Sequence, residues 1–213
     1  MGLAVLTVAF IGVGGAAIDD YFDRESDAVI HLDRPTPLHQ ISPINAFQFS
    51  ALMFVAGLLV SFVIKALAFG ITALAIALFI FYPRIFKRYL GFLSNLVIGF
   101  LGATMPLFAE ATVFQTIIAA SLSSVGMIAA CAIGLNVLKG VLTLDGDLMI
   151  GHPTFDIKSN VRVAAVVGAL FLLFSVLTSP LPYLVSIVGI VYLIPVTMWG
   201  VLFLFGIVAV KES

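Results

Sequence analysis

Residues 1–33 read MGLAVLTVAFIGVGGAAIDDYFDRESDAVIHLD, an apolar run of eighteen residues followed by a stretch that holds six of the chain's eleven acidic residues. If the helix expected for the apolar run continues, Asp20, Asp23 and Asp27 recur at i, i+3 and i+7 on one face, with Asp19 beside Asp23. Such a row of carboxylates repels itself unless a cation is present. Because Mg²⁺ typically binds one or two carboxylates together with the phosphates of a substrate, the row predicts a Mg²⁺ site.

The composition of the whole chain is that of an integral membrane protein. Of its 213 residues, 62% are hydrophobic and only 10% are charged, whereas about a quarter are charged in a soluble domain. Seven apolar runs are separated by short polar stretches: Met1–Ile18, Pro43–Ile64, Ala66–Tyr82, Phe92–Ala109, Val113–Leu138, Val161–Thr178 and Leu181–Val210.

Six of these runs are close to the ~20 residues that an α-helix needs to cross a bilayer. The last run is longer and contains Pro195, so it is either one kinked helix or a helix followed by a partial second one. We therefore expect an all-α, polytopic membrane bundle of about seven transmembrane helices, forming a single integral-membrane domain over residues 1–213.

The basic residues predict the orientation of this bundle in a cell membrane. If the helices alternate in direction, nine of the ten Lys and Arg residues fall on the side of the acidic stretch, and only Lys65 falls on the other. The positive-inside rule then places the acidic stretch in the cytoplasm. A cleaved signal peptide over Met1–Ile18 is disfavoured because it lacks a basic lead. Glu110 is expected to be solvated in the loop after the fourth run. The net charge of −1 gives no indication of a nucleic-acid partner.

Several basic residues on the predicted cytoplasmic side have two possible roles. Arg34 could pair with Asp33 or anchor the chain at the membrane surface, but its planar guanidinium also matches phosphate oxygens. The loop that contains Lys87 could be a topology anchor or could bind a polyphosphate held by metal on its other side. Lys139, at the inner end of the fifth run, could extend to the membrane surface or contact a diphosphate.

Three segments together resemble a known family. DDYFDRESD followed by DRPTP resembles the first aspartate-rich motif of the UbiA superfamily of intramembrane prenyltransferases, N-D-x-x-D-x-x-x-D and then R-P-x-P. The loop YPRIFKRYLG resembles a family segment with Tyr followed four or five residues later by Lys, and GDLMIGHPT resembles the end of the second aspartate-rich motif. The matching residues are Asp20, Asp23, Asp27, Arg34, Pro35, Pro37, Tyr82, Lys87, Gly146, Asp147, Gly151 and Thr154.

This resemblance implies an enzyme that transfers a polyprenyl group, such as geranylgeranyl, from its diphosphate to a lipid or aromatic acceptor. It implies Mg²⁺ as cofactor and the membrane lipids as further partners. The chain looks most like archaeal members that make digeranylgeranylglyceryl phosphate, for which the acceptor is geranylgeranylglyceryl phosphate. The catalytic and metal-binding residues it implies are Asp20, Asp23, Asp27 and Asp147. The diphosphate-binding residues it implies are Arg34, Tyr82, Lys87 and Lys139.

The resemblance is incomplete in the second aspartate-rich motif, R-E-x-x-K-D-x-x-D-x-x-x-D. Where that motif has its first two aspartates, this chain has Gly140 and Thr143, and only Asp147 remains. The resemblance also runs only from the family's second helix to about its eighth, so it implies a bundle without the first and last helices. Two alternatives stay open: a catalytically impaired relative that binds a prenyl lipid, and a cation transporter.

Overall fold

The computed structural model describes residues 1–30, 41–117, 121–142, 161–186 and 188–212, and their side chains except at 25–30, 88, 92 and 204–212. The described elements are all helical. They are α1 (Gly2–Ile30), α2 (Pro43–Ile64), α3 (Ala66–Phe81), η1 (Tyr82–Phe86), α4 (Lys87–Tyr89), η2 (Gly91–Leu93), α5 (Ser94–Val113), α6 (Leu122–Leu142), α9 (Val161–Thr178), α10 (Leu181–Leu184), η4 (Ile190–Tyr192) and α11 (Leu193–Glu212). The expectation of an all-α polytopic bundle is confirmed.

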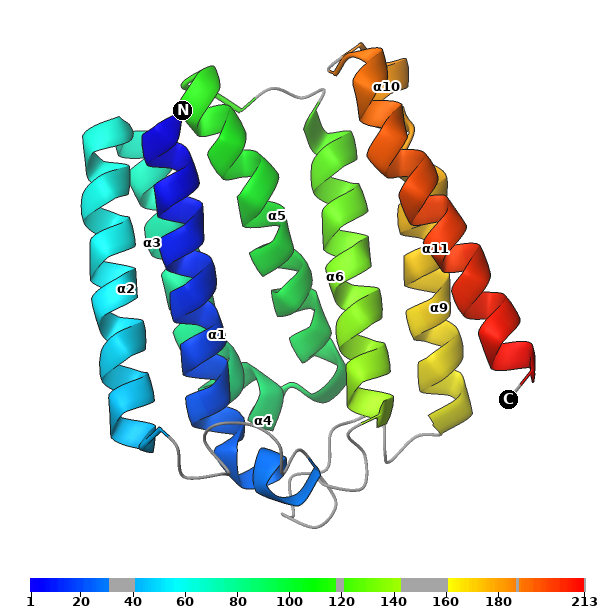
Figure 1. Ribbon diagram of the computed structural model, residues 1–213, viewed down its shortest axis with the longest axis horizontal. Coiled ribbons are helices and arrows are strands. Elements are labelled where there is room, and N and C mark those ends of the chain that lie inside the picture. The colour runs from blue at the N-terminus through cyan, green and yellow to red at the C-terminus, as the bar shows by residue number, and fades with distance from the viewer. Residues whose placement is uncertain (31–40, 118–120, 143–160, 187, 213) are drawn as a thin grey trace.

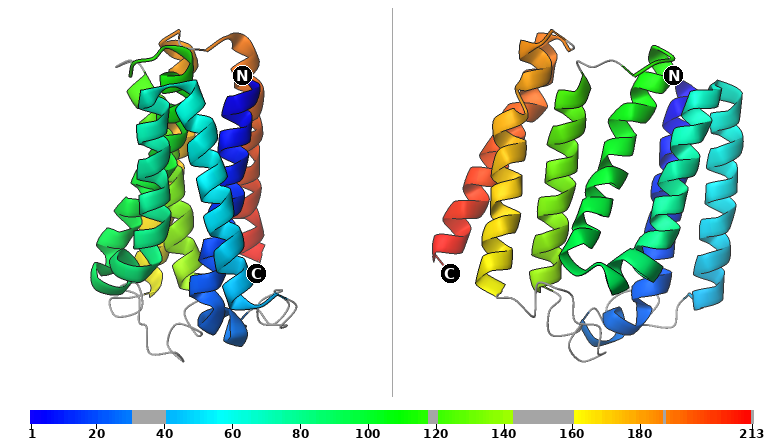
Figure 2. Two further views of the ribbon diagram at one scale, coloured as in Figure 1. Left: turned by 90° about the vertical axis from the view of Figure 1, so that its left-hand side faces the viewer. Right: turned by 180° about the vertical axis from the view of Figure 1, so that it is seen from behind.

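The long helices lie side by side along a common direction, and helices that follow one another in the chain pack on one another (Figures 1 and 2). Contacts lead from α1 to α2, α3, α5, α6, α9 and finally α11, and α1 also touches α3, η1 and α5. Many large apolar side chains remain exposed on this bundle, including Leu59 at 65% and Phe100 at 68%. Exposed apolar surface of this extent is what a lipid-facing protein presents.

Helix α1 is one continuous helix of 29 residues that contains both the apolar run and the start of the acidic stretch. It packs closely against α2 at Gly14, where an added Cβ atom would lie 2.9 Å from the Phe54 ring. The Ser50 hydroxyl donates a hydrogen bond of 2.7 Å to the carbonyl oxygen of Gly14. This contact gives a buried hydroxyl a partner inside an apolar bundle, as burial of a polar group requires.

Within the described part of the chain, six helical segments are long and apolar enough to span a membrane: residues 2–24, 43–64, 66–86, 94–113, 122–142 and 161–184. The region predicted as the seventh run, Leu181–Val210, is divided into α10, η4 and α11, and not one straight helix. Pro180 precedes α10 and Pro195 lies in the first turn of α11, positions at which a residue without a backbone N–H is tolerated.

The expected position of Glu110 was wrong. This residue lies within α5, which continues to Val113, and its side chain is only 7% exposed. The sequence-based boundary ended the span where the first charge appeared. The helix in fact continues for another turn, because neighbouring helices cover that turn, as the fully buried Ala111 shows.

The α6–α9 contact depends on two facing glycines. A Cβ atom at Gly134 would lie 2.8 Å from the carbonyl oxygen of Gly168 and 2.9 Å from Cγ of Leu172. Because the first of these atoms is backbone, we expect Gly134→Ala to separate the helices and to lower the free energy of unfolding by about 1–3 kcal/mol. Thermal unfolding in detergent micelles measures this.

Gly126→Ala is the matched control for that substitution. It lies in the same helix, and a Cβ atom there would meet nothing within 4 Å. The gain in helix propensity should make this variant neutral or up to about 1 kcal/mol more stable. Equal melting temperatures for the two variants would show that the close approach at Gly134 contributes nothing to stability.

Candidate functional site

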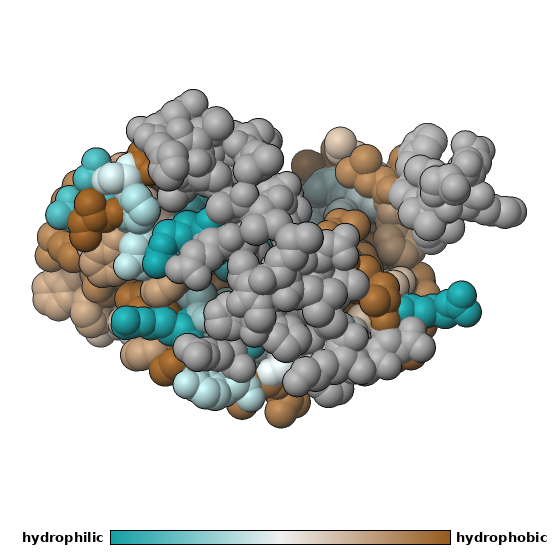
Figure 3. All heavy atoms as spheres, turned by 90° about the horizontal axis from the view of Figure 1, so that it is seen from below, coloured by the Kyte–Doolittle hydropathy of each residue, from teal (hydrophilic) through white to brown (hydrophobic). Residues whose placement is uncertain are grey.

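The polar residues that the sequence singles out meet at one end of the bundle, the end opposite the N-terminus (Figure 1). Here the last turns of α1 approach η1 and α4, and α6 ends beside them. Seen from this end, the molecule shows hydrophilic side chains interspersed with hydrophobic ones (Figure 3). This end of the bundle is the polar mouth, defined by Asp19, Asp23, Tyr82, Lys87 and Lys139.

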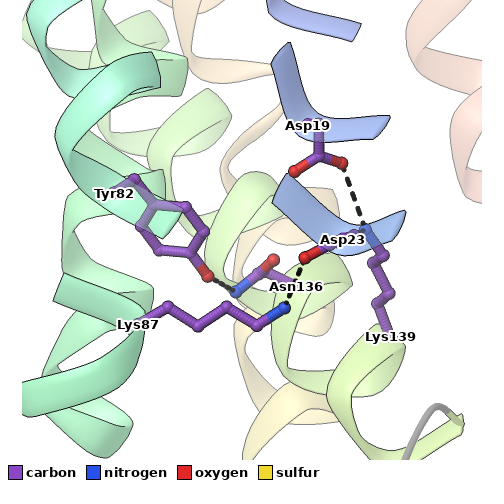
Figure 4. Close-up of polar contacts among 6 residues, drawn as sticks. All are labelled: Asp19, Asp23, Tyr82, Lys87, Asn136 and Lys139. Atoms are coloured by element: carbon purple, nitrogen blue, oxygen red, sulfur yellow. Dashed lines mark hydrogen bonds and ion pairs between the residues drawn. The ribbon is translucent and has the colours of Figure 1, made fainter. Parts of the chain in front are cut away.

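A widened helical turn places two of these residues. Residues Tyr82–Phe86 form a π-helical turn, in which the backbone N–H of Lys87 donates to the carbonyl oxygen of Tyr82. Pro83 explains the widening, because proline has no N–H to continue the ordinary α-helical ladder. The turn joins α3 to α4 and presents the Tyr82 and Lys87 side chains toward α1 and α6 (Figure 4).

Two lysines bridge the carboxylates of α1 to the neighbouring helices. Lys87 Nζ lies 2.9 Å from Asp23 Oδ1, and this carboxylate side chain is only 13% exposed. Lys139 Nζ lies 3.5 Å from Asp19 Oδ2 and 3.8 Å from Asp23 Oδ2 (Figure 4). Two carboxylates and two ammonium groups, contributed by three separate elements, therefore form one charge cluster.

A neutral hydrogen-bonded group lies next to this cluster. The side-chain nitrogen of Asn136 donates to the Tyr82 hydroxyl oxygen at 2.9 Å and to Oδ1 of Asn95 at 2.7 Å. Asn95, in the first turn of α5, is only 4% exposed. Neither asparagine is among the site residues that the sequence predicts. Their pairing links residues 41 positions apart, and no local pattern indicates it.

The structure brings four of the eight predicted site residues together, namely Asp23, Tyr82, Lys87 and Lys139. Asp20 lies in α1 one position from Asp19, and the backbone of Asp27 continues the same helix, as the i, i+3, i+7 spacing requires. The side chain of Asp27, and the whole of Arg34, Thr143 and Asp147, lie outside the described residues.

The cluster has the ligand chemistry that Mg²⁺ prefers. Asp19 and Asp23 present carboxylate oxygens close enough together for one lysine to reach both. Hard divalent cations bind such oxygens, and Mg²⁺ usually completes its coordination with water and substrate phosphates rather than with a cage of protein ligands. Among the described side chains, no group of three or more Asp, Glu, His or Cys residues is arranged to hold a metal. The described part of the site thus fits a metal shared with a phosphate ligand.

Residues 1–212 match the UbiA prenyltransferase family. The digeranylgeranylglyceryl phosphate synthase of Natronomonas pharaonis is 33% identical over 195 residues, which cover 91% of this chain and 69% of that protein. The synthase of the same name from Methanosarcina mazei is 32% identical over 208 residues, which cover 97% of this chain and 71% of that protein.

Two solved structures resemble the whole bundle. A UbiA homolog from Archaeoglobus fulgidus, bound to DMAPP and Mg²⁺, superposes with a TM-score of 0.73 at 14% identity and covers 99% of this chain and 75% of its own. A structure described as giving insights into digeranylgeranylglyceryl phosphate synthase in membranes superposes with a TM-score of 0.65 at 26% identity, covering 99% of this chain and 74% of its own. The fold, the polar mouth and the match over nearly the whole sequence agree: this chain belongs to the UbiA prenyltransferase family.

Proposed function

We propose that this protein transfers a geranylgeranyl group from geranylgeranyl diphosphate to geranylgeranylglyceryl phosphate, with Mg²⁺ as cofactor. The names of the relatives that are about a third identical over most of their length support the choice of both substrates. The observation that carries the proposal is the meeting of Asp19 and Asp23 with Lys87 and Lys139 at one end of an apolar bundle. An isoprenoid diphosphate needs this combination, because its head is a polyanion and its tail is a hydrocarbon.

In this proposal the carboxylates of α1 hold the metal. Asp20, Asp23 and Asp27 would bind it, with Asp147 contributing to a second, weaker position. Bound Mg²⁺ supplies Lewis-acid neutralisation of the charge that accumulates on the leaving diphosphate. We add Asp19 to this proposed set, because its carboxylate shares Lys139 with that of Asp23.

The cationic residues would bind the diphosphate itself. Lys87 and Lys139 now neutralise Asp23 and Asp19, and both ammonium groups would turn to phosphate oxygens when substrate and metal arrive. Arg34 would add a planar, bidentate contact. Fixed positive charges near the leaving oxygens stabilise the transition state more than the ground state, which is how they accelerate the reaction. The surrounding apolar helices would keep water away from the allylic cation.

We further propose that the polar mouth faces the cytoplasm, in line with the distribution of Lys and Arg. Cysteine labelling tests this in a Cys131→Ala background, which removes the chain's single cysteine. Tyr89→Cys, beside the mouth and 73% exposed in the native residue, should react with a membrane-impermeant maleimide only after the cytoplasmic face is opened. Lys65→Cys, at the other end of the bundle, should react in intact cells. The reverse pattern would contradict the proposed orientation.

The direct test of function is product formation by the purified protein in lipid nanodiscs. Geranylgeranyl diphosphate, Mg²⁺ and geranylgeranylglyceryl phosphate should yield digeranylgeranylglyceryl phosphate, and EDTA should abolish the product. Replacing the acceptor with an aromatic acid such as 4-hydroxybenzoate should give no product. Donor binding without any transfer would instead identify a prenyl-lipid-binding protein without activity and would refute the proposal.

A further inference from the structure

The hydrogen bonds around the Tyr82 hydroxyl join neutral side chains and lie beside the charge cluster. Asn136 contacts Tyr82 from α6, and Asn95 contacts Asn136 from α5, so three elements converge on one neutral group. The two asparagines are separated from each other by 41 positions and from Tyr82 by up to 54 in the sequence. Burying a polar side chain inside a membrane bundle costs free energy unless the side chain is hydrogen-bonded. A buried polar set of this kind therefore indicates a structural or functional role.

The direction of these hydrogen bonds decides what the phenol can do. The Asn136 nitrogen donates both to the Tyr82 oxygen, at 2.9 Å, and to Oδ1 of Asn95, at 2.7 Å. With Asn95 Oδ1 as the acceptor, the Asn136 amide presents its nitrogen to Tyr82 as well. The Tyr82 oxygen thus acts as an acceptor toward Asn136, so the phenol's own hydrogen is not used in that bond.

The neighbours of Tyr82 place its hydroxyl group beside the proposed diphosphate site. Lys87 comes from the same widened turn, and the backbone hydrogen bond between the two residues couples their positions. The Lys87 ammonium lies 2.9 Å from Asp23, in the proposed diphosphate site (Figure 4). Ser94, at the start of α5, also lies near the Tyr82 hydroxyl. A phenol O–H held beside that ammonium adds a neutral donor to a cationic one.

The family resemblance already implies that Tyr82 binds the diphosphate. We propose in addition that Asn136 and Asn95 form an amide clasp that holds the Tyr82 hydroxyl in position to donate to the departing diphosphate. This inference rests on the proposed prenyl-transfer function. In the step concerned, the allylic C–O bond breaks and its electron pair stays on the diphosphate oxygen, which accepts the Tyr82 hydrogen bond while the proton remains on the phenol. Asn136 and Asn95 do not touch the substrate, so they are positioning residues.

The alternative role for the clasp is purely structural, as a hydrogen-bonded contact between α5 and α6. Hydrogen bonds between membrane helices contribute about 0.6 kcal/mol on average, so a structural role would show as a small loss of stability. A positioning role predicts a change in kcat that disappears when the Tyr82 hydroxyl is absent. The two roles are therefore separable by combining substitutions.

The decisive variant is Asn136→Asp, which keeps the size of the side chain but offers only acceptors. The carboxylate would accept the phenol's hydrogen and withdraw it from the diphosphate. We expect Asn136→Asp and Tyr82→Phe each to lower kcat by roughly 10- to 100-fold, the range for one hydrogen bond to a charged group. Adding Asn136→Asp to Tyr82→Phe should lower kcat by less than a further factor of about two.

Three measurements accompany the rates in nanodiscs: the melting temperature, KM, and the Kd of the uncleavable geranylgeranyl thiodiphosphate analogue. We expect KM and Kd to change much less than kcat, because the hydrogen bond strengthens as charge develops on the leaving group. Asn45→Asp is the matched control. It makes the same substitution at an exposed site on the same end of the bundle, and it should leave all four quantities unchanged.

The outcomes separate the clasp from the proposed function. If Asn136→Asp lowered kcat as much in the Tyr82→Phe background as it does in the wild-type protein, the clasp would be overturned, because the asparagine would then act independently of the phenol. A rise in Mg²⁺-dependent turnover would also overturn it, since the new carboxylate would be acting as a metal ligand. Wild-type protein that makes no product refutes the proposed function, whereas normal turnover of Asn136→Asp refutes the clasp alone.

Discussion

Asp23→Asn is expected to lower the rate of prenyl transfer by about 10²–10³-fold, the range measured when one preorganised electrostatic group is removed from a transition state. Asp23 is the most enclosed carboxylate of the described cluster, at 13% side-chain exposure, and both Lys87 and Lys139 lie within 4 Å of it. Asparagine keeps the shape but loses the charge that a metal requires. Initial rates at saturating substrate, together with a Mg²⁺ titration, measure the effect.

Asp19→Asn is the comparison for this substitution. Asp19 is 42% exposed, and its ion pair with Lys139 is longer, at 3.5 Å. We therefore expect a smaller loss of rate, because solvent screens an exposed carboxylate and weakens its interactions. Equal losses for the two variants, or an unchanged Mg²⁺ dependence in Asp23→Asn, would contradict the assignment of Asp23 to the metal.

Lys87→Gln is expected to weaken binding of the diphosphate donor by roughly 10- to 100-fold, corresponding to about 1.5–3 kcal/mol for a hydrogen bond to a charged group. The lysine side chain is 30% exposed and its ammonium already lies in the cluster, so little reorganisation is needed when the substrate replaces Asp23 as its partner. The Kd of geranylgeranyl thiodiphosphate in the presence of Mg²⁺ measures this directly.

Two other lysines serve as controls for Lys87→Gln. Lys139 is 48% exposed and more distant from both carboxylates, so Lys139→Gln should weaken binding less. Lys65 lies between α2 and α3 at the opposite end of the bundle, and Lys65→Gln should leave the Kd unchanged. If Lys65→Gln and Lys87→Gln had the same effect, the binding of the donor would reflect net charge and not the polar mouth.

The parts of the fold that the sequence predicted correctly are those set by local chemistry. The apolar run before Asp19 does continue as a helix past Asp27 to Ile30, because none of the acidic residues in that segment is a helix breaker. Ser42 and Pro43 form a sequence pattern typical of a helix start, and Ser42 caps α2 by accepting a hydrogen bond from the backbone of Asn45. Hydropathy also located the spans, because a bilayer demands about 20 apolar residues whatever the helices pack against.

The parts that the sequence could not predict depend on tertiary contacts. Glu110 marks the end of an apolar run, but the helix continues past it. The Asn136–Tyr82 contact depends on how α6 packs against η1, which no periodicity within either segment reveals. For the site, the spacing of the aspartates predicted which face of α1 is acidic. The particular lysine that each aspartate meets follows only from the bundle.

The continuity of α1 also affects how substrates arrive. At 1.5 Å per residue, its 29 residues extend for about 44 Å, which exceeds the ~30 Å hydrocarbon layer by a few turns. A lipid whose phosphates rest at those final turns keeps its headgroup at the level of neighbouring headgroups and its tail among their acyl chains. Under the proposed function, donor and acceptor therefore reach the enzyme by lateral diffusion within one leaflet, without extraction into water. Turnover should then follow their surface density in the bilayer and not their bulk concentration.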